Sequence, residues 1–206
     1  GATPPARPTL LAPGTVAPDF VMRDVNDKAV HLADFKGKVV ILDFWATWCG
    51  PCIASFPHTQ KIAAQYKDQD VVVVASGTSD TIAAFKKWIP VNQPKYADMR
   101  FVFDPNERGS DTFDKRASSS LYGVSGIPTQ FVIGRDGKIV ASIVGNGGDT
   151  DTRTEGALAL AGVKVDAATA TGLGPATRLS LTFGVLFVDY DLDGRLDLLQ
   201  SHRLPA

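Results

Sequence analysis

The sequence predicts an α/β fold in which helices flank a mixed central β-sheet. Residues 39–45 and 70–76 are continuous runs of mainly apolar and β-branched residues, as expected for strands covered on both faces. A helical pattern over about 49–68 lies between them and completes a right-handed β-α-β unit. Residues 130–133 and 138–144 alternate around an Arg-Asp-Gly turn, which predicts a β-hairpin and adds antiparallel strands to the sheet.

Composition places the chain among ordinary globular proteins. Its 206 residues allow one medium domain with an appendage, or two small domains, and 44% of them are hydrophobic. The net charge of −1 and the lack of a basic run argue against nucleic acid as a partner. No stretch of the sequence approaches the roughly 20 apolar residues of a membrane span. A signal peptide is not recognisable either, although a trimmed chain would have lost one.

The first part of the chain predicts a tether followed by a small hairpin. Residues 1–16 are rich in proline and small residues, which favours a flexible leader in a protein whose upstream signal or anchor has been removed. We expect the folded domain to span 17–164. It opens with strands over 20–25 and 29–32, and a short turn at 33–37 leads to the first central strand.

Further elements are expected around the central strands. They are a helix over 79–89, a strand over 100–103, a helix over 110–121 and a closing helix over 152–161. Thr78 or Ser79 is the predicted N-cap of the first of these helices, because short hydroxyl side chains satisfy free backbone N–H groups. Pro90 is expected to end that helix, since proline has no N–H to donate.

Cys49-Gly50-Pro51-Cys52 connects the first central strand to its helix. At a helix N-terminus, unpaired backbone N–H groups and the helix dipole both favour a thiolate. Cys49 is therefore the predicted nucleophile, with a pKa below the free value of about 8.5. Cys52, one turn further on, is placed to resolve a mixed disulfide. Pro51 fits the first helical turn, where its missing N–H costs nothing. The two thiols predict a reversible two-electron switch.

Three other roles of a C-x-x-C pair fit the sequence less well. A structural zinc site needs four ligands, but the chain has two cysteines and three scattered histidines. Haem attachment requires a histidine directly after Cys52, where Ile53 stands. A purely structural disulfide across two residues closes too small a loop to stabilise the fold much. We therefore interpret the pair as a redox-active dithiol.

The stretch 44–52, FWATWCGPC, closely resembles the active-site motif of the thioredoxin superfamily. Segments 14–20 and 36–38 resemble, more narrowly, its extracytoplasmic TlpA/ResA-like branch, and the resemblance covers about residues 14–163. It implies a thioredoxin fold with an extra N-terminal hairpin, and an extracytoplasmic bacterial thiol–disulfide oxidoreductase. The implied partners are proteins with disulfides or thiols and an upstream thiol–disulfide electron donor. No organic cofactor is implied, since the electrons reside on sulfur.

The same resemblance assigns a partner-binding surface. Trp48, Gly50 and Pro51 are expected to contact the partner, and the Gly50-Pro51 dipeptide of thioredoxin favours a reductant. A second motif, YGVSGIPT, resembles the superfamily segment that carries a cis-proline facing the dithiol. It implies that the Ile127–Pro128 bond is cis and that the Ile127 backbone pairs with an extended substrate segment. An ordinary turn is the alternative interpretation of this motif.

Asp43 is a carboxylate in an otherwise apolar strand, a costly position unless it has a partner or a task. It lies six residues before Cys49, which matches the buried acid of thioredoxin and implies that Asp43 takes the proton of Cys52. Many TlpA-like proteins have a glutamate where this chain has Ser55, and we expect Asp43 to replace that acid. An exposed aspartate at a strand end is the alternative. His58 is interpreted as a surface or capping histidine, with proton transfer as the alternative.

The last part of the chain does not belong to that fold. Residues 165–180 resemble a linker, and 181–206 contain the pattern D-x-D-x-D-G-x-x-D, whose oxygen atoms suit calcium. This segment resembles a partial FG-GAP/VCBS repeat of the integrin-type β-propellers. The expected Ca²⁺ ligands are the side chains of Asp189, Asp191, Asp193 and Asp197 and the carbonyl group of Arg195. An acidic hairpin loop without a metal is the alternative.

A single repeat of this kind cannot close a propeller, because each blade needs neighbours to bury its faces. Either further repeats follow residue 206, or the segment packs on the redox domain, or it forms a homodimer with a second copy. We expect a second domain that is only partly present.

Two other functions compete with the oxidoreductase. A peroxiredoxin has a similar opening segment, but it carries a threonine three residues before its cysteine, where this chain has Ala46. This difference argues against peroxidase activity. The non-enzymatic alternative is a calcium-dependent adhesion or scaffold protein in which the redox domain is secondary.

Overall fold

The computed structural model describes residues 9–148, 151–166, 185–188 and 197–200. Its main element is a seven-stranded sheet. The strands are β1 (Val21–Arg23), β2 (Ala29–His31), β3 (Val39–Trp45), β4 (Val71–Gly77), β5 (Met99–Phe103), β6 (Thr129–Ile133) and β7 (Ile139–Val144). They lie in the order β2-β1-β5-β4-β3-β6-β7, with β3, β4 and β5 parallel and the other pairs antiparallel. The prediction of a mixed sheet is confirmed.

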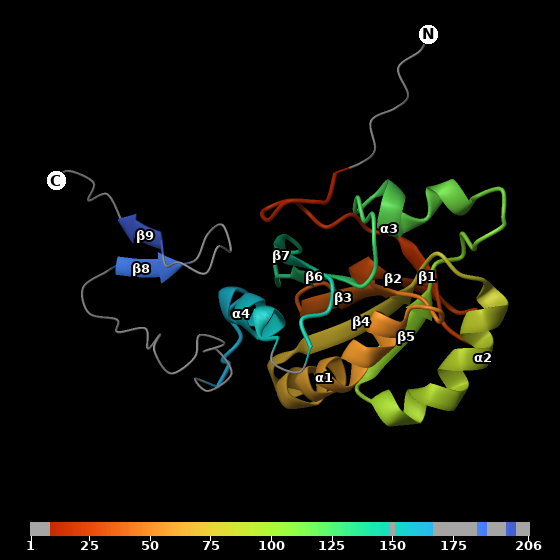
Figure 1. Cartoon of the computed structure of the whole chain (residues 1–206), viewed down its shortest axis with the longest axis horizontal. Coiled ribbons are helices and arrows are strands. Elements are labelled where there is room, and N and C mark those ends of the chain that lie inside the picture. Colours follow the sequence, from red (N-terminus) through yellow and green to blue (C-terminus); the bar gives the residue numbers. More distant parts are fainter. Residues whose placement is uncertain (1–8, 149–150, 167–184, 189–196, 201–206) are drawn as a thin grey trace, which may run out of the picture.

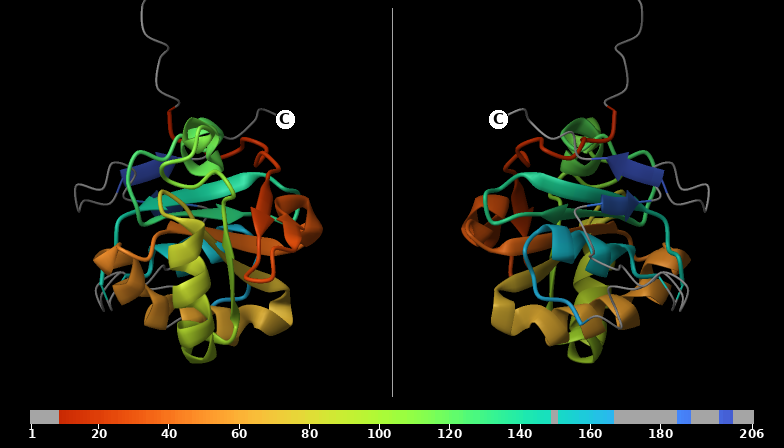
Figure 2. Two further views of the ribbon diagram at one scale, coloured as in Figure 1. Left: turned by 90° about the vertical axis from the view of Figure 1, so that its right-hand side faces the viewer. Right: turned by 90° about the vertical axis from the view of Figure 1, so that its left-hand side faces the viewer.

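Helices cover both faces of this sheet (Figure 1). They are the α-helices α1 (Gly50–Tyr66), α2 (Ile82–Asn92), α3 (Ala117–Ser120) and α4 (Arg153–Leu160), with short 3-10 turns η1 (Leu32–Phe35), η2 (Lys67–Gln69), η3 (Gln93–Tyr96) and η4 (Phe113–Lys115). α1, α2 and α4 lie on one face, and α3 lies on the opposite face, as the side views in Figure 2 also show. The predicted β-α-β unit is therefore β3-α1-β4, and β6 and β7 form the predicted hairpin.

Strand β3 runs through the middle of the molecule, and all seven of its residues are buried. Its side chains alternate between two apolar clusters, as the two-residue period of a strand requires. Ile41 and Trp45 belong to the cluster beneath α1 and α2, whereas Leu42 and Phe44 belong to the cluster on the other face. This alternation places Asp43 on the face that α1 covers, directly under the start of that helix.

Helix α2 differs from its predicted boundaries at both ends. It begins at Ile82, and its N-cap is Thr81, whose Oγ1 accepts a hydrogen bond of 3.2 Å from the Ala84 N–H, so the prediction of Thr78 or Ser79 was wrong. Ser79 has a φ of 53°, outside the helical region. Pro90 does not end the helix. It lies in the last turn, so its missing N–H removes only one hydrogen bond close to the helix end, and the helix continues to Asn92.

The helix predicted over 110–121 is mostly absent. Its place is taken by the turn η4 and the four-residue α3, which Arg116 separates with an extended ψ of 134°. Asp104 explains this arrangement, because its buried carboxylate accepts hydrogen bonds from the N–H groups of Asn106 (2.8 Å) and Ala117 (2.7 Å). The side chain thus anchors both ends of the loop to the end of β5.

Residues 9–16, which we predicted as part of a flexible leader, pack against the fold instead. The Leu11 N–H donates to the Tyr122 carbonyl oxygen (3.2 Å), and the Gly14 N–H donates to the Ile139 carbonyl oxygen (2.8 Å). Leu10 and Leu11 also pack on the apolar cluster that contains Phe44. The first eight residues of the predicted leader lie outside the described residues.

The structure describes only part of the predicted C-terminal segment. Strands β8 (Val185–Val188) and β9 (Asp197–Gln200) form a separate antiparallel pair. The predicted linker from residue 167 onward and the candidate calcium ligands Asp189, Asp191, Asp193 and Arg195 lie outside the described residues, and so does the side chain of Asp197. The structure therefore does not test the calcium site. Among the described residues, no helix has the length and apolar character needed to cross a membrane.

The contact between β4 and α2 yields a stability prediction. A Cβ atom added at Gly77 would overlap the ring of Phe85, which is fully packed beside Trp45 and Phe103. We expect Gly77→Ala to lower the free energy of unfolding by about 1–3 kcal/mol. Gly156→Ala in α4 is the matched control, because its Cβ meets open space and alanine favours a helix by up to about 1 kcal/mol. Urea unfolding of both variants measures the two effects, and equal stabilities would contradict the tight packing.

Candidate active site

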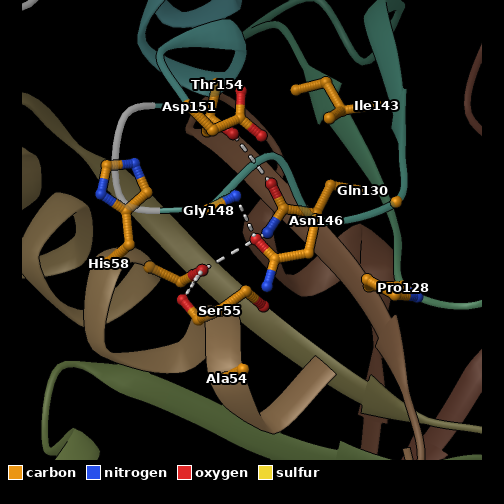
Figure 3. Close-up of a pocket in the computed structure, with 12 residues that line it drawn as sticks. Ala54, Ser55, His58, Pro128, Gln130, Ile143, Asn146, Gly148, Asp151 and Thr154 are labelled. Carbon is orange, nitrogen blue, oxygen red and sulfur yellow. Dashed lines mark hydrogen bonds between the residues drawn. The ribbon is translucent and has the colours of Figure 1, made fainter. Parts of the chain in front are cut away.

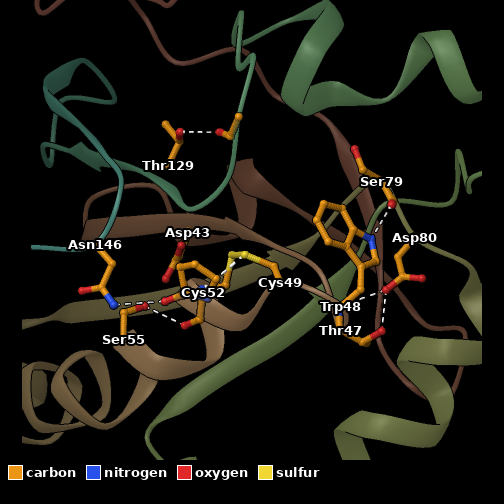
Figure 4. Close-up of a disulfide and its surroundings, with 12 residues drawn as sticks. Asp43, Thr47, Trp48, Cys49, Cys52, Ser55, Ser79, Asp80, Thr129 and Asn146 are labelled. Atoms are coloured by element: carbon orange, nitrogen blue, oxygen red, sulfur yellow. Dashed lines mark hydrogen bonds between the residues drawn. A yellow bond between two sulfur atoms is a disulfide. The ribbon is translucent and has the colours of Figure 1, made fainter. Parts of the chain in front are cut away.

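The two cysteines lie at the start of α1 and form a disulfide (Figure 4). The S–S distance is 2.04 Å and the two Cα atoms are 5.3 Å apart. Cys49 is the N-cap residue, and its Sγ accepts a hydrogen bond of 3.3 Å from the backbone N–H of Cys52. Pro51 occupies the first turn, as predicted. The prediction that Cys49 sits at a helix N-terminus is thereby confirmed.

The loop that leads to Cys49 is braced from β4. Asp80, which is only 3% exposed, accepts hydrogen bonds through Oδ2 from the Thr47 N–H (3.0 Å) and the Thr47 hydroxyl group (2.5 Å). Trp48 donates through Nε1 to the Ser79 carbonyl oxygen (3.0 Å) and remains 56% exposed. The carboxyl ends of parallel β3 and β4 meet at one edge of the sheet. The loops that follow the two strands are therefore in contact, although they are far apart in the chain.

The Ile127–Pro128 peptide bond is cis, as the resemblance implied. Ile127 borders a groove of about 180 Å³ that also contains Trp48, Arg116 and Gly126 in its walls. Within the described residues, neither the N–H nor the C=O group of Ile127 takes part in a backbone hydrogen bond. The groove therefore combines an exposed indole with an unpaired stretch of backbone.

Asp43 is fully buried, so the alternative of an exposed aspartate was wrong. Its Oδ2 accepts a hydrogen bond of 3.0 Å from Gln130 Nε2, and no group in the described part of the chain is hydrogen-bonded to its Oδ1. Figure 4 shows the carboxyl group between β3 and the Cys52 end of the disulfide. Burial raises the pKa of Asp43 from 3.8 to about 7, and the hydrogen bond from Gln130 opposes that rise.

His58 lies on α1 and contacts a buried carboxylate. Its Nε2 is 3.2 Å from Oε1 of Glu155, while its side chain is 26% exposed. Hydrogen bonding to Glu155 raises the pKa of His58, and partial burial opposes this shift. The histidine caps no helix and is paired with α4. It also borders a small cavity of about 30 Å³ that Gln130 and Thr154 line from the other side (Figure 3).

Three residues of the site were missed by the sequence analysis: Asp80, Gln130 and Asn146. Asn146 donates through Nδ2 to the Pro51 carbonyl oxygen (3.1 Å) and so holds the first turn of α1. Gln130 is a polar residue inside a buried strand, which is the same signal that identified Asp43. Asp80 follows the carboxyl end of β4, where polar side chains of parallel sheets gather. Asn146 gave no signal in the sequence.

The raised pKa of Asp43 predicts a pH dependence of stability. Between about pH 4 and pH 7 the folded protein retains a proton on Asp43 that the unfolded chain has released, so stability should fall as the pH rises through this window. The shift corresponds to a loss on the order of 4 kcal/mol. Asp43→Asn should remove this loss, which urea unfolding of the oxidised protein at several pH values would measure. Parallel pH profiles for the two proteins would contradict the prediction.

Sequence comparison identifies relatives over most of the chain. The family model described as Redoxin matches residues 12–158. The thiol-disulfide oxidoreductase ResA of Bacillus subtilis is 36% identical over 138 residues, which cover 66% of this chain and 69% of that protein. ResA of Bacillus anthracis is 34% identical over 145 residues, covering 70% of this chain and 76% of the relative. The Redoxin match includes the Cys49–Cys52 pair.

Solved structures agree with the sequence relatives. The thiol:disulfide interchange protein DsbE from Chlorobium tepidum superposes with a TM-score of 0.61 and 34% identity, covering 73% of this chain and 98% of that chain. An exposed lipoprotein thioredoxin from Streptococcus pneumoniae gives a TM-score of 0.50 and 34% identity, with 62% and 90% coverage. The sheet and helices described above are therefore a thioredoxin-like fold. The chain belongs to the redoxin family and is a ResA-like thiol–disulfide oxidoreductase whose Cys49–Cys52 pair forms a disulfide.

Proposed function

We propose that the protein reduces disulfides of partner proteins, with Cys49 as the attacking residue and Cys52 as the resolving residue. The observation that carries this assignment is the N-cap position of Cys49, whose Sγ already accepts the Cys52 N–H. In the reduced protein, the same N–H and the helix dipole stabilise a Cys49 thiolate. Cys52 lies inside the first turn and has no exposed surface, which suits attack on Cys49 rather than on a partner.

The reaction proceeds in two successive thiol–disulfide exchanges. The Cys49 thiolate attacks one sulfur of the partner disulfide, forming a mixed disulfide and releasing one partner thiolate. The Cys52 thiolate then attacks Cys49 Sγ, forming the Cys49–Cys52 disulfide and releasing the second partner thiolate. Two electrons pass from the dithiol to the partner, so no organic cofactor is needed. Each released thiolate takes up a proton from solvent.

Asp43 is assigned the task of removing the proton from Cys52 before the second exchange. Its burial beneath Cys52 and its unpaired Oδ1 support this role. With a pKa of about 7, the carboxyl group is divided between its two protonation states near neutral pH, the condition under which a general base is most effective. Ser55 carries no carboxyl group, and its hydroxyl group donates to the Cys52 carbonyl oxygen (2.7 Å).

The groove between Trp48 and Ile127 is assigned to the partner protein. An extended partner segment adds to the unpaired Ile127 backbone in the manner of a β-strand, beside Pro128, which has no N–H of its own. Exposed Trp48, Gly50 and Pro51 surround the disulfide and provide the remaining contact surface. Because backbone atoms dominate this contact, partners with different side chains can be accepted.

The proposal also includes the direction of electron transfer and the cellular location of the protein. The Gly50-Pro51 dipeptide is the one found in thioredoxin, which supports a reductant that receives electrons from an upstream thiol–disulfide donor. An extracytoplasmic location is supported by the relative from Streptococcus pneumoniae, which is described as an exposed lipoprotein. Disulfides persist in that environment, so a reductant has substrates there.

The reduction potential tests the proposed direction. In defined thiol–disulfide buffers, we expect a value near about −270 mV for the Cys49–Cys52 couple, at the thioredoxin end of the scale. A value near about −120 mV would instead identify a disulfide donor.

The roles of the two cysteines can be tested separately by trapping. Cys52→Ser should trap a mixed disulfide with a partner protein, whereas Cys49→Ser should trap none, because only Cys49 attacks. Equal trapping by both variants would contradict the assigned roles.

Calcium binding by the C-terminal segment stays a prediction, as do the FG-GAP/VCBS resemblance and a homodimer formed through it. We expect millimolar calcium to raise the melting temperature of the tail without changing disulfide exchange. The double substitution Asp191→Asn and Asp193→Asn should abolish this effect, because it removes two predicted ligand charges. Titration calorimetry on the full chain and light scattering would measure binding and oligomeric state. No binding at about 1 mM, the weak end for extracellular sites, would refute the calcium prediction.

A further inference from the structure

Gln130 faces Asp43 directly across two central strands. β3 and β6 are antiparallel, and their register makes Asp43 and Gln130 partners. Partners in such a pair have side chains on the same face of the sheet, close enough to interact. Both residues sit in strands that are buried along their whole length. A buried amide is also costly unless its donor and acceptor groups are satisfied, so this pairing calls for a specific reason.

The hydrogen bonds around Gln130 fix the orientation of its amide group. Nε2 donates to Asp43 Oδ2 (3.0 Å) and lies 3.4 Å from the Thr59 hydroxyl oxygen. Thr59 gives its own proton to the Ser55 carbonyl oxygen (3.1 Å), so its oxygen is free to accept from Gln130. On the other side, the Thr154 hydroxyl group donates to Gln130 Oε1 (3.0 Å). Every hydrogen bond in this network therefore has one donor and one acceptor, and the NH₂ group of Gln130 points to Asp43.

We propose that Gln130 is a positioning residue for Asp43. It holds Oδ2 in place and stabilises the ionised carboxyl group, so that Oδ1, which has no other partner, is left as the atom that receives the proton of Cys52. This inference rests on the proposed role of Asp43. Thr59 on α1 and Thr154 on α4 act through Gln130, because they orient its amide group and do not contact Asp43.

The position of the small cavity supports this role. Gln130 and Thr154 line the cavity, whereas Asp43 does not (Figure 3). Its volume of about 30 Å³ leaves room for one or two water molecules. Gln130 therefore lies between the carboxyl group and this cavity, so Asp43 keeps its hydrogen bond to an amide where water would otherwise compete.

The charged groups near this network lie on the far side of Gln130. His58 on α1 and Asp151 before α4 border the cavity, and buried Glu155 of α4 lies 3.2 Å from His58. The titratable groups on the near side are the two cysteines of α1. Gln130 is thus the direct polar contact of Asp43 within the described residues, and removing it changes the local environment more than any distant charge does.

The test compares two glutamine–aspartate pairs in one protein. Gln130→Met keeps the shape of the side chain and removes its donor. Gln60→Met is the matched control, because Gln60 donates in the same way to Asp98 (2.8 Å) at the exposed surface. The pKa of Asp43 is measured by carboxyl ¹³C NMR in the reduced protein, with Asp43→Asn to assign the signal. Resolution of a mixed disulfide is followed as a function of pH.

We expect Gln130→Met to raise the pKa of Asp43 by about one unit, which reduces the ionised fraction about tenfold below that pKa. The pH profile of resolution should move upward by the same amount, while Gln60→Met should leave both unchanged. If Gln130→Met does not fold, Thr154→Val takes its place and should give a smaller shift in the same direction, because it only releases the far end of the amide.

Two outcomes separate this inference from the proposed function. An unchanged pKa of Asp43 in Gln130→Met, or in Thr154→Val if that variant is used, would overturn the role of Gln130. Unchanged resolution kinetics in Asp43→Asn would instead overturn the role of Asp43 in proton transfer. A raised pKa together with a shifted pH profile supports both, and rescue of the profile by Gln130→Asn would support the donor group itself.

Discussion

The site depends on one constraint, which is the burial of a carboxyl group in the most enclosed strand of the sheet. β3 is covered along its whole length by apolar clusters on both faces, and Asp43 is its one charged residue. An ionised group in such a place is unfavourable, so its proton affinity rises until it titrates near neutral pH. The fold that makes Asp43 costly for stability is therefore also what makes it suited to proton transfer.

The central part of the fold could be predicted because its signals are local. The runs that became β3 and β4 are mainly apolar, and the predicted β3 has the observed boundaries. The segment around 110–121 could not be predicted, because its conformation depends on a hydrogen bond from the Ala117 N–H to Asp104, which lies 13 residues earlier, just after β5. The same holds for residues 9–16, whose partners Tyr122 and Ile139 lie more than a hundred residues away in the chain.

The residues of the site divide in the same way, into those that a local sequence signal predicts and those whose role depends on a distant partner. Cys49 and Pro128 were found because each belongs to a motif with a recognisable spacing, and Asp43 was found because a charge interrupts an apolar strand. Gln130 interrupts β6 in a similar way but was missed. The role of a buried amide group depends on which residue faces it, and the sequence of one strand does not tell this. Only the register of β3 and β6 reveals that pairing. Asp80 was missed for a related reason, because its partner Thr47 is 33 residues away.

The arrangement separates the path of the electrons from the path of the proton. In the proposed reaction, exposed Trp48 and the Ile127 backbone lie on the side of the disulfide that contacts the partner. Asp43 and Gln130 lie beneath it, inside the molecule and away from that groove. A partner can therefore cover Cys49 completely without blocking the removal of the proton from Cys52. In the reaction that we propose, the second exchange follows binding of the partner, so Asp43 on the inner side would remain in place as the base throughout.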